Sequence, residues 1–214
     1  MGSKTTKRAV LIGTALILYI LWLALGTLSE YYPIKNYPPA QYGSILLFGD
    51  SLATTSGVGF TNILEKRLDI SIMTRIIATG TLHSNTEYVA REIVQQKPRI
   101  VIFCFSDNNE VGNLAQAQYQ GDLRTVIADA QQSGAVTLLL GASRIHPNAQ
   151  QEDILMQLAR ETHSIIVPNI LLFVENNQHY WDNNALNAGG NLRVADMIAP
   201  TLEGLTFNTV KQPQ

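Results

Sequence analysis

From residue 44 onward, short apolar runs alternate with amphipathic stretches. The apolar runs end in turn residues, as "SILLFGD" does at 44–50, and such runs are typical of buried strands. The stretches between them carry apolar residues at helical spacing, as Phe60, Ile63, Leu64 and Leu68 do, which predicts helices. The predicted strands are 44–50, 70–80, 99–109, 135–143 and 164–169, and the predicted helices are 59–69, 85–98, 114–134, 148–163 and 188–205.

This alternation predicts one α/β domain over residues 44–206. Strands that alternate with helices of about ten to fifteen residues are joined by right-handed crossovers, which make a parallel sheet covered on both faces. We therefore expect a three-layer α/β/α, flavodoxin-like domain with a five-stranded parallel sheet. Gly134 is predicted to end the third helix, and residues 207–214 are predicted to be a flexible tail.

The N-terminal part of the chain predicts a membrane anchor. Residues 1–8 carry Lys4, Lys7 and Arg8 and no acid, and residues 9–28 form an uncharged apolar run long enough to span a bilayer. Basic residues before the span favour a cytoplasmic N-terminus and an extracytoplasmic C-terminal domain. Residues 29–43, rich in proline and tyrosine, are interpreted as a stalk. The alternative is a signal peptide cleaved after "ALG" at 24–26.

Composition and charge narrow the class of protein only slightly. The chain is 46% hydrophobic and 15% charged, and its formal net charge of -2 does not favour a nucleic-acid partner. Its single cysteine, Cys104, cannot form an intramolecular disulfide. Because it sits in the apolar run "IVIFCF", Cys104 is interpreted as a small buried hydrophobic residue.

Polar residues follow the predicted strands, where parallel sheets build their ligand sites. Ser51 follows the first strand, Gly80 ends the second and Asn108 follows the apolar part of the third. A serine hydroxyl attacks a carbonyl only with a nearby base and an oxyanion hole. In a tight turn Ser51 can present its Oγ and its N–H together, while Gly80 and Asn108 can supply an N–H and a side-chain amide.

Several of these stretches resemble the GDSL family, also called SGNH hydrolases. "FGDSLATTSG" is similar to the family's first block, "IIATGTLHSNT" to its second and "FSDNN" to its third. The resemblance covers about residues 44–205 and implies that Ser51 is the nucleophile, with Ser51, Gly80 and Asn108 forming the oxyanion hole. It also implies an esterase, lipase, thioesterase, carbohydrate deacetylase or acyltransferase that needs no metal or other cofactor.

The last block of the resemblance departs from the family pattern. The family carries Asp-x-x-His before its final helix, and this chain has Asp182 at the aspartate position but Ala185 at the histidine position. A methyl group cannot take or return a proton. Two other histidines are candidate substitute bases: His179, three residues before Asp182, and His83, three residues after Gly80.

The sequence thus favours a membrane-anchored serine ester hydrolase in which Ser51 is the nucleophile and Asp182 supports the base, with a lipid or an acetylated glycan as the expected substrate. The alternative is an inactive module of the same fold that binds a ligand or serves as a structural subunit of a membrane complex. In that case the histidine of the family pattern would have been lost naturally at Ala185. If the histidine had instead been replaced by engineering, the natural protein would be an ordinary enzyme. Without the histidine, Asp182 is expected to cap the final helix or hold the loop, and Asp50 is expected to play a structural, hydrogen-bonding role.

Overall fold

A computed structural model of the 214-residue chain describes the α/β domain. The described residues are 44–50, 52–53, 59–77, 82–105, 113–142, 149–174, 176–182 and 185–206. They all belong to the second of the two units into which the chain divides, Pro38–Gln214. The predicted anchor, stalk and tail lie outside them. Within the described ranges, no helix is both long and apolar enough to cross a bilayer.

The centre of the domain is a parallel sheet of five strands in the order β2-β1-β3-β4-β5. This order and the parallel pairing of every neighbour confirm the predicted flavodoxin-like sheet. The strands are β1 (Ile45–Gly49), β2 (Ile72–Ile76), β3 (Ile100–Cys104), β4 (Val136–Leu140) and β5 (Ile165–Val167).

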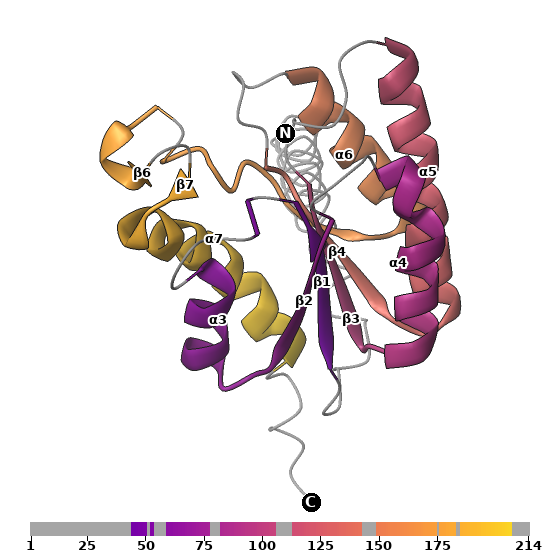
Figure 1. Ribbon diagram of the computed structural model, residues 1–214, viewed down its shortest axis with the longest axis horizontal. Coiled ribbons are helices and arrows are strands. Elements are labelled where there is room, and N and C mark those ends of the chain that lie inside the picture. Colours follow the sequence, from indigo (N-terminus) through magenta and orange to yellow (C-terminus); the bar gives the residue numbers. More distant parts are fainter. Residues whose placement is uncertain are drawn as a thin grey trace, which may run out of the picture. The chain divides into compact units, whose positions relative to one another are not determined.

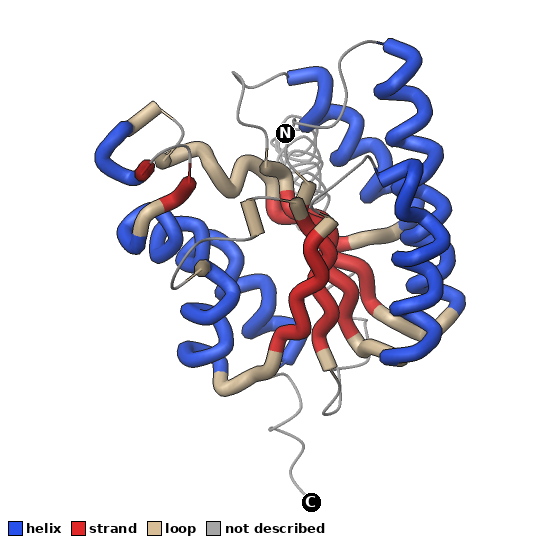
Figure 2. Tube along the Cα trace, viewed as in Figure 1, coloured by secondary structure: helices blue, strands red, loops and turns tan. Residues whose placement is uncertain are grey.

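Helices cover both faces of this sheet, as the continuous apolar strands require. Every residue of β1, β3 and β4 is buried, which is typical of strands covered on both sides. One face is covered by α3 (Phe60–Leu68) and α7 (Ala188–Thr206) (Figures 1 and 2). The other face is covered by α4 (Leu82–Gln96), α5 (Asn113–Gln132) and α6 (Ala149–Thr162).

The core on the face of α4, α5 and α6 is rich in aromatic residues. Phe48 and Phe103 stack with their ring centroids 6.0 Å apart, and Phe103 stacks on Phe105 at 6.4 Å. Phe105 meets the ring of Tyr119 from α5 edge-on at 6.5 Å. These contacts join β1, β3 and α5, so the helical layer holds the strand ends in place.

Most element boundaries agree with the sequence pattern, and the differences concern short elements. Gly134 follows α5 with φ +86°, and Ala135 N–H donates to the Ala130 carbonyl, which confirms the predicted glycine stop. Helix α4 begins at Leu82 instead of the predicted residue 85, so His83 lies in its first turn. The pattern also missed a 3-10 helix, η3 (Gln178–Tyr180), and two short strands, β6 (Trp181–Asp182) and β7 (Ala185–Leu186). Elements of two or three residues are too short to show a periodicity.

Candidate functional site

The carboxyl ends of β1, β2 and β3 meet at one edge of the sheet. The Ile77 N–H after β2 donates to the Gly49 carbonyl at 2.8 Å, and the Asp50 N–H after β1 donates to the Cys104 carbonyl at 3.4 Å. The strand order reverses between the parallel neighbours β1 and β3, and ligands of such sheets bind at that point. The segments that leave these three strand ends include Ser51, Gly80 and Asn108, which lie outside the described residues.

The turn that follows β1 is held by its own aspartate. The Asp50 side chain is buried, and its Oδ1 accepts a hydrogen bond from the Leu52 N–H at 2.9 Å. The Ala53 N–H donates to the Asp50 carbonyl at 3.0 Å. A carboxylate that binds a backbone N–H two residues ahead makes an Asx turn. Asp50 therefore has the structural role that the sequence predicted.

Gly49 is required at the start of this turn because there is no room for a side chain. A Cβ at this position would lie 2.6 Å from the Ala53 Cβ and 2.9 Å from the Cys104 carbonyl oxygen. The Cβ of Ala53 is bonded directly to its backbone and the Cys104 oxygen is a backbone atom, so neither can move without moving the main chain. The glycine thus lets β1 run against β3 as far as the turn.

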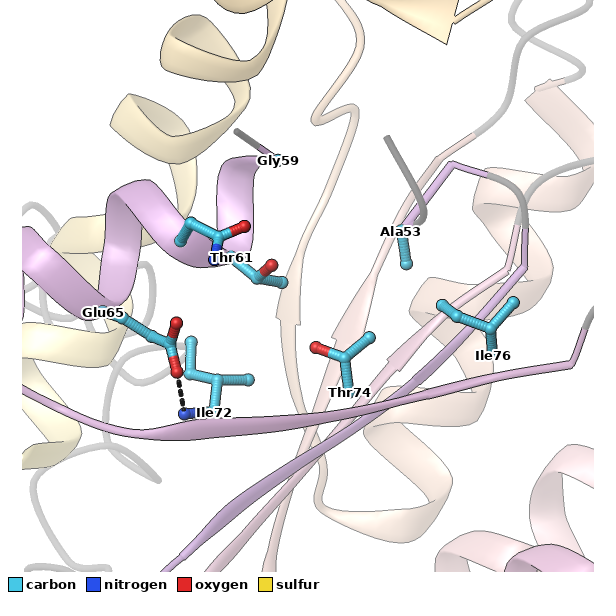
Figure 3. Close-up of a pocket in the computed structure, with 8 residues that line it drawn as sticks. Ala53, Gly59, Thr61, Glu65, Ile72, Thr74 and Ile76 are labelled. Atoms are coloured by element: carbon cyan, nitrogen blue, oxygen red, sulfur yellow. Dashed lines mark hydrogen bonds between the residues drawn. The ribbon is translucent and has the colours of Figure 1, made fainter. Parts of the chain in front are cut away.

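An open pocket of about 330 Å³ lies between α3 and β2 and reaches the turn at Ala53 (Figure 3). The side chain of Thr74 projects from β2 toward α3, which carries Thr61 and Glu65, and the side chain of Ile76 lies on the side of Ala53. Glu65 Oε1 accepts a hydrogen bond from the Ile72 N–H at 2.8 Å, which fixes this carboxylate at the pocket wall. The pocket therefore presents hydroxyl and carboxylate groups beside the start of the β1 turn.

The predicted last block folds as a β-hairpin that brings Asp182 and Ala185 together. Strands β6 and β7 are antiparallel, and Asp182 is the direct partner of Ala185. Directly paired residues of antiparallel strands project their side chains to the same face, with Cβ atoms about 5 Å apart. Asp182 is exposed and Ala185 is half-buried. The hairpin thus has the geometry for an aspartate to support a side chain at 185, but the side chain there is a methyl group.

Asn187, not Asp182, caps the final helix. Its Oδ1 accepts from the Gly190 N–H at 3.1 Å, and its Nδ2 donates to the His179 carbonyl at 2.6 Å. The expectation that Asp182 caps α7 is therefore wrong. Asn187 serves better because it lies immediately before the first helical residue, Ala188, where a side-chain oxygen reaches the unpaired N–H groups of the first turn.

Asn191 is a structural residue that the sequence reasoning missed. It is 1% exposed, and its Nδ2 donates to the carbonyls of Leu186 and Asn187 at 2.8 and 3.0 Å. Its Oδ1 accepts at 3.0 Å from the N–H of Phe60, the first residue of α3. One amide thereby fixes the start of α3, the start of α7 and the hairpin. The available signal was a polar residue on the apolar stripe that continues with Val194, Ala195 and Ile198.

The two candidate bases have different environments. His83 Nδ1 lies 3.1 Å from Asp122 Oδ2 of α5, and the His83 side chain is 59% exposed. The ring of His179 packs edge-on against Tyr180 with centroids 5.7 Å apart. In the part of the chain that the structure describes, no carboxylate forms an ion pair with His179. Asp122 was not among the residues singled out from the sequence, because it is 39 positions from His83 and nothing local marks it.

The described residues do not indicate a metal centre. Within the ranges given above, no three histidine, cysteine, aspartate or glutamate side chains are grouped closely enough to hold an ion. The site described so far consists of three strand ends, an Asx turn, a hairpin with an aspartate and a histidine–carboxylate pair.

Comparison with known proteins gives one relative at the sequence level. No protein-family model matches the chain. The chain is similar to Esterase TesA of Pseudomonas aeruginosa, with 27% identity over 114 residues. The match covers 49% of this chain and 56% of TesA, so it spans about half the length of that protein.

Solved structures match over most of the chain. The crystal structure of TesA superposes with a TM-score of 0.64 and 23% identity, covering 76% of this chain and 99% of TesA. The esterase EstA from Pseudoalteromonas sp. gives 0.62 and 15%, covering 75% and 96%. A catalytic mutant of Axe2, an acetylxylan esterase from Geobacillus stearothermophilus, gives 0.60 and 17%, covering 80% and 97%. The structural neighbours are thus GDSL/SGNH hydrolases, and this chain has their fold.

Proposed function

We propose that this chain is a serine ester hydrolase of the GDSL/SGNH type, held at a membrane by residues 9–28. The observation that carries the proposal is the meeting of three strand ends at one edge of the sheet. The chain leaves these ends toward Ser51, Gly80 and Asn108, the residues that match the first three blocks of the family. The Asx turn at Asp50 supports the same reading, because it shapes the backbone on either side of Ser51.

In the proposed reaction the Ser51 hydroxyl attacks an ester carbonyl and forms a tetrahedral intermediate. The N–H groups of Ser51 and Gly80 and the side-chain amide of Asn108 stabilise the oxyanion. A base accepts the serine proton and returns it to the leaving alcohol, which gives an acyl-enzyme. A water molecule then attacks the acyl group with the help of the same base, and the acid and free Ser51 are released.

His83 is the better of the two candidate bases. Asp122 contacts the Nδ1 side of its ring, which leaves Nε2 as the nitrogen that can exchange a proton. A carboxylate on one ring nitrogen orients a histidine so that the other nitrogen can accept the serine proton, as in serine hydrolases. His179 has no such partner among the described residues. In this proposal His83 and Asp122 replace the pair that the family forms from its last block.

The second candidate function is a non-catalytic binding module of the same fold. It is favoured by the pairing of Asp182 with Ala185, since the hairpin carries the aspartate without the proton acceptor that it would orient. Loss of the histidine of a serine triad lowers turnover by about 10⁶, leaving about 10³–10⁴ over water from the oxyanion hole and binding. A chain without a substitute base would therefore bind an ester and barely hydrolyse it.

The deciding experiment is hydrolysis of p-nitrophenyl acetate by the full chain in detergent. We expect Ser51→Ala and His83→Ala each to lower kcat/KM by about 10³-fold or more, since a nucleophile and its base act as one unit. His179→Ala is the matched control and should stay within about twofold. Circular dichroism of each variant checks that it is folded.

Each outcome assigns a function. If the parent chain is no faster than Ser51→Ala, the hydrolase proposal is wrong and the binding module stands. If Ser51→Ala is inactive while His83→Ala is fully active, Ser51 is the nucleophile and His83 is not its base. Asp122→Asn should lower kcat and leave KM unchanged if the carboxylate acts by supporting His83.

A further inference from the structure

Two adjacent apolar side chains project into solvent in the turn that follows β5. Leu172 is 52% exposed and Phe173 is 65% exposed. Residues 168–174, "PNILLFV", contain no ionisable side chain, and the first charged residue after them is Glu175. Leaving a phenylalanine and a leucine side by side in water gives up the free energy that their burial would provide. We call these two residues the 172–173 corner.

The corner is attached to the hairpin that carries Asp182 and Ala185. Trp181 Nε1 donates to the carbonyl of Val174, the next residue after the corner, at 2.7 Å. The Tyr180 ring lies over the start of α7, since a Cβ at Gly189 would be 3.5 Å from that ring. A third exposed apolar residue, Leu192, follows one turn further along α7 and is 50% exposed. The corner therefore lies next to the hairpin that carries Asp182 and Ala185.

Chain length limits how far the domain can be from the predicted anchor. Residues 29–43 separate the apolar run from the first described residue, Ser44. Even fully extended, these residues reach about 50 Å at 3.3–3.6 Å each. A tether of this length holds the domain at an effective concentration in the millimolar range, at which a weak surface contact is populated.

We propose that the 172–173 corner docks on the bilayer in which the chain is anchored, so that the proposed ester hydrolase faces membrane lipid esters. The inference rests on the proposed membrane anchoring. Uncharged apolar side chains flanked by the aromatic residues Tyr180 and Trp181 are the composition of a membrane-interface contact. In this contact the side chains of Leu172 and Phe173 insert between the lipid head groups. The hairpin next to them then faces the ester bonds of those lipids.

The test places one fluorescent label on the corner and an identical label far from it. Phe173→Cys carries an environment-sensitive NBD maleimide, and Val94→Cys is the matched control. Val94 is 63% exposed, and it lies near the end of α4, on the other side of the sheet from the hairpin (Figure 1). The native Cys104 is buried and does not compete for the label. Both full-length proteins are reconstituted in phosphatidylcholine–phosphatidylglycerol vesicles.

We expect the label at 173 to emit at shorter wavelength than the label at 94, because only the label at 173 reaches the membrane interface. For the same reason, nitroxide-labelled lipid should quench the label at 173 about fivefold more than the label at 94. The label at 94 should be the one quenched by aqueous iodide. Equal quenching of the two labels by lipid and by iodide overturns the proposal, as does failure of the chain to float with the vesicles. A label at 173 that is shielded from iodide but not quenched by lipid points to a protein partner and also overturns it.

A second readout separates this surface from the hydrolase itself. Phe173→Asp should lower hydrolysis of an ester held in vesicles by about tenfold while leaving hydrolysis of soluble p-nitrophenyl acetate unchanged, and Val94→Asp should change neither. If the parent chain hydrolyses neither ester but the label at 173 is still quenched by lipid, the docking proposal stands and the hydrolase proposal is wrong. If Phe173→Asp hydrolyses both esters at the parent rate, the docking proposal is wrong and the hydrolase proposal stands.

Discussion

Position 185 shows how one side chain controls the chemistry of a whole hairpin. The backbone pairing of β6 and β7 places residue 185 directly opposite Asp182, and the two side chains share one face. An imidazole at 185 is long enough to reach the Asp182 carboxylate across the strand pair, whereas the methyl group of Ala185 is not. The geometry for an aspartate–histidine pair is therefore present without the histidine.

A histidine introduced at position 185 should supply a base. We expect Ala185→His to raise kcat/KM for p-nitrophenyl acetate by about 10²-fold or more over a parent that lacks a working base, since general-base catalysis contributes about 10²–10⁴. Steady-state hydrolysis by the full chain measures this. In the same background, Asp182→Asn should remove most of the gain. A folded Ala185→His protein with no gain would mean that residue 185 does not face the proposed nucleophile.

At the scale of elements, the beginning of α7 holds the hairpin in position. Asn187 caps the helix, Asn191 links it to α3, and Gly190 packs directly against the 3-10 helix η3. A Cβ at Gly190 would be 2.6 Å from the Tyr180 carbonyl oxygen and 2.9 Å from Leu186 Cδ2. The neighbouring Gly189 has room, because its nearest contact would be 3.4 Å away.

These two adjacent glycines provide a matched pair of substitutions. Gly190→Ala should lower the free energy of unfolding by about 1–3 kcal/mol, because backbone on the facing element must move to admit the methyl group. Gly189→Ala should change it by less than about 1 kcal/mol, because alanine suits a helix and meets only ordinary contacts. Urea unfolding followed by circular dichroism measures both. Equal effects would contradict the close packing of η3 on α7.

At the scale of the molecule, the sheet is covered by helices on both sides, and Cys104 is the last residue of its middle strand, β3. The thiol is completely buried on β3, and the pKa of this thiol is raised well above its ordinary value of 9.0, first by burial and second by the nearby Asp50 carboxylate. In the unfolded chain the same thiol loses its proton near its ordinary pKa. Above that pH the unfolded state binds fewer protons than the folded state, so the folded state loses stability as the pH rises.

The Cys104 thiol should thus make the protein sensitive to alkaline pH. We expect the free energy of unfolding to fall by up to about 1.4 kcal/mol per pH unit above pH 9 through this group. Below pH 9 its contribution should be constant. Urea unfolding between pH 7 and pH 10.5 measures the slope, and Cys104→Ala supplies the reference in which lysines and tyrosines still titrate. Identical pH profiles for the two proteins would show that the thiol ionises normally in the folded state.

The elements that were predicted well are those whose own sequence carries the signal. Strands β1, β3 and β5 are continuous apolar runs, and the glycine stop after α5 lies in the residues that form it. The early start of α4, the helix η3 and the β6–β7 hairpin were missed. They are short segments whose conformation depends on packing against α5 and α7, and their own residues have no periodicity to show it.

For the whole molecule and its candidate site, too, local sequence determined some features and tertiary packing determined others. The sequence by itself determined the parallel α/β sheet, the location of the candidate polar residues after its strands, and the identity of Ala185, since periodicity and residue order are local properties. Only the tertiary structure decided that His83 pairs with Asp122, that Asp182 faces Ala185, and that Asn191 joins Phe60 across 131 positions. Such contacts depend on how helices and strands pack, and a pattern read along one chain does not contain the distances between its elements.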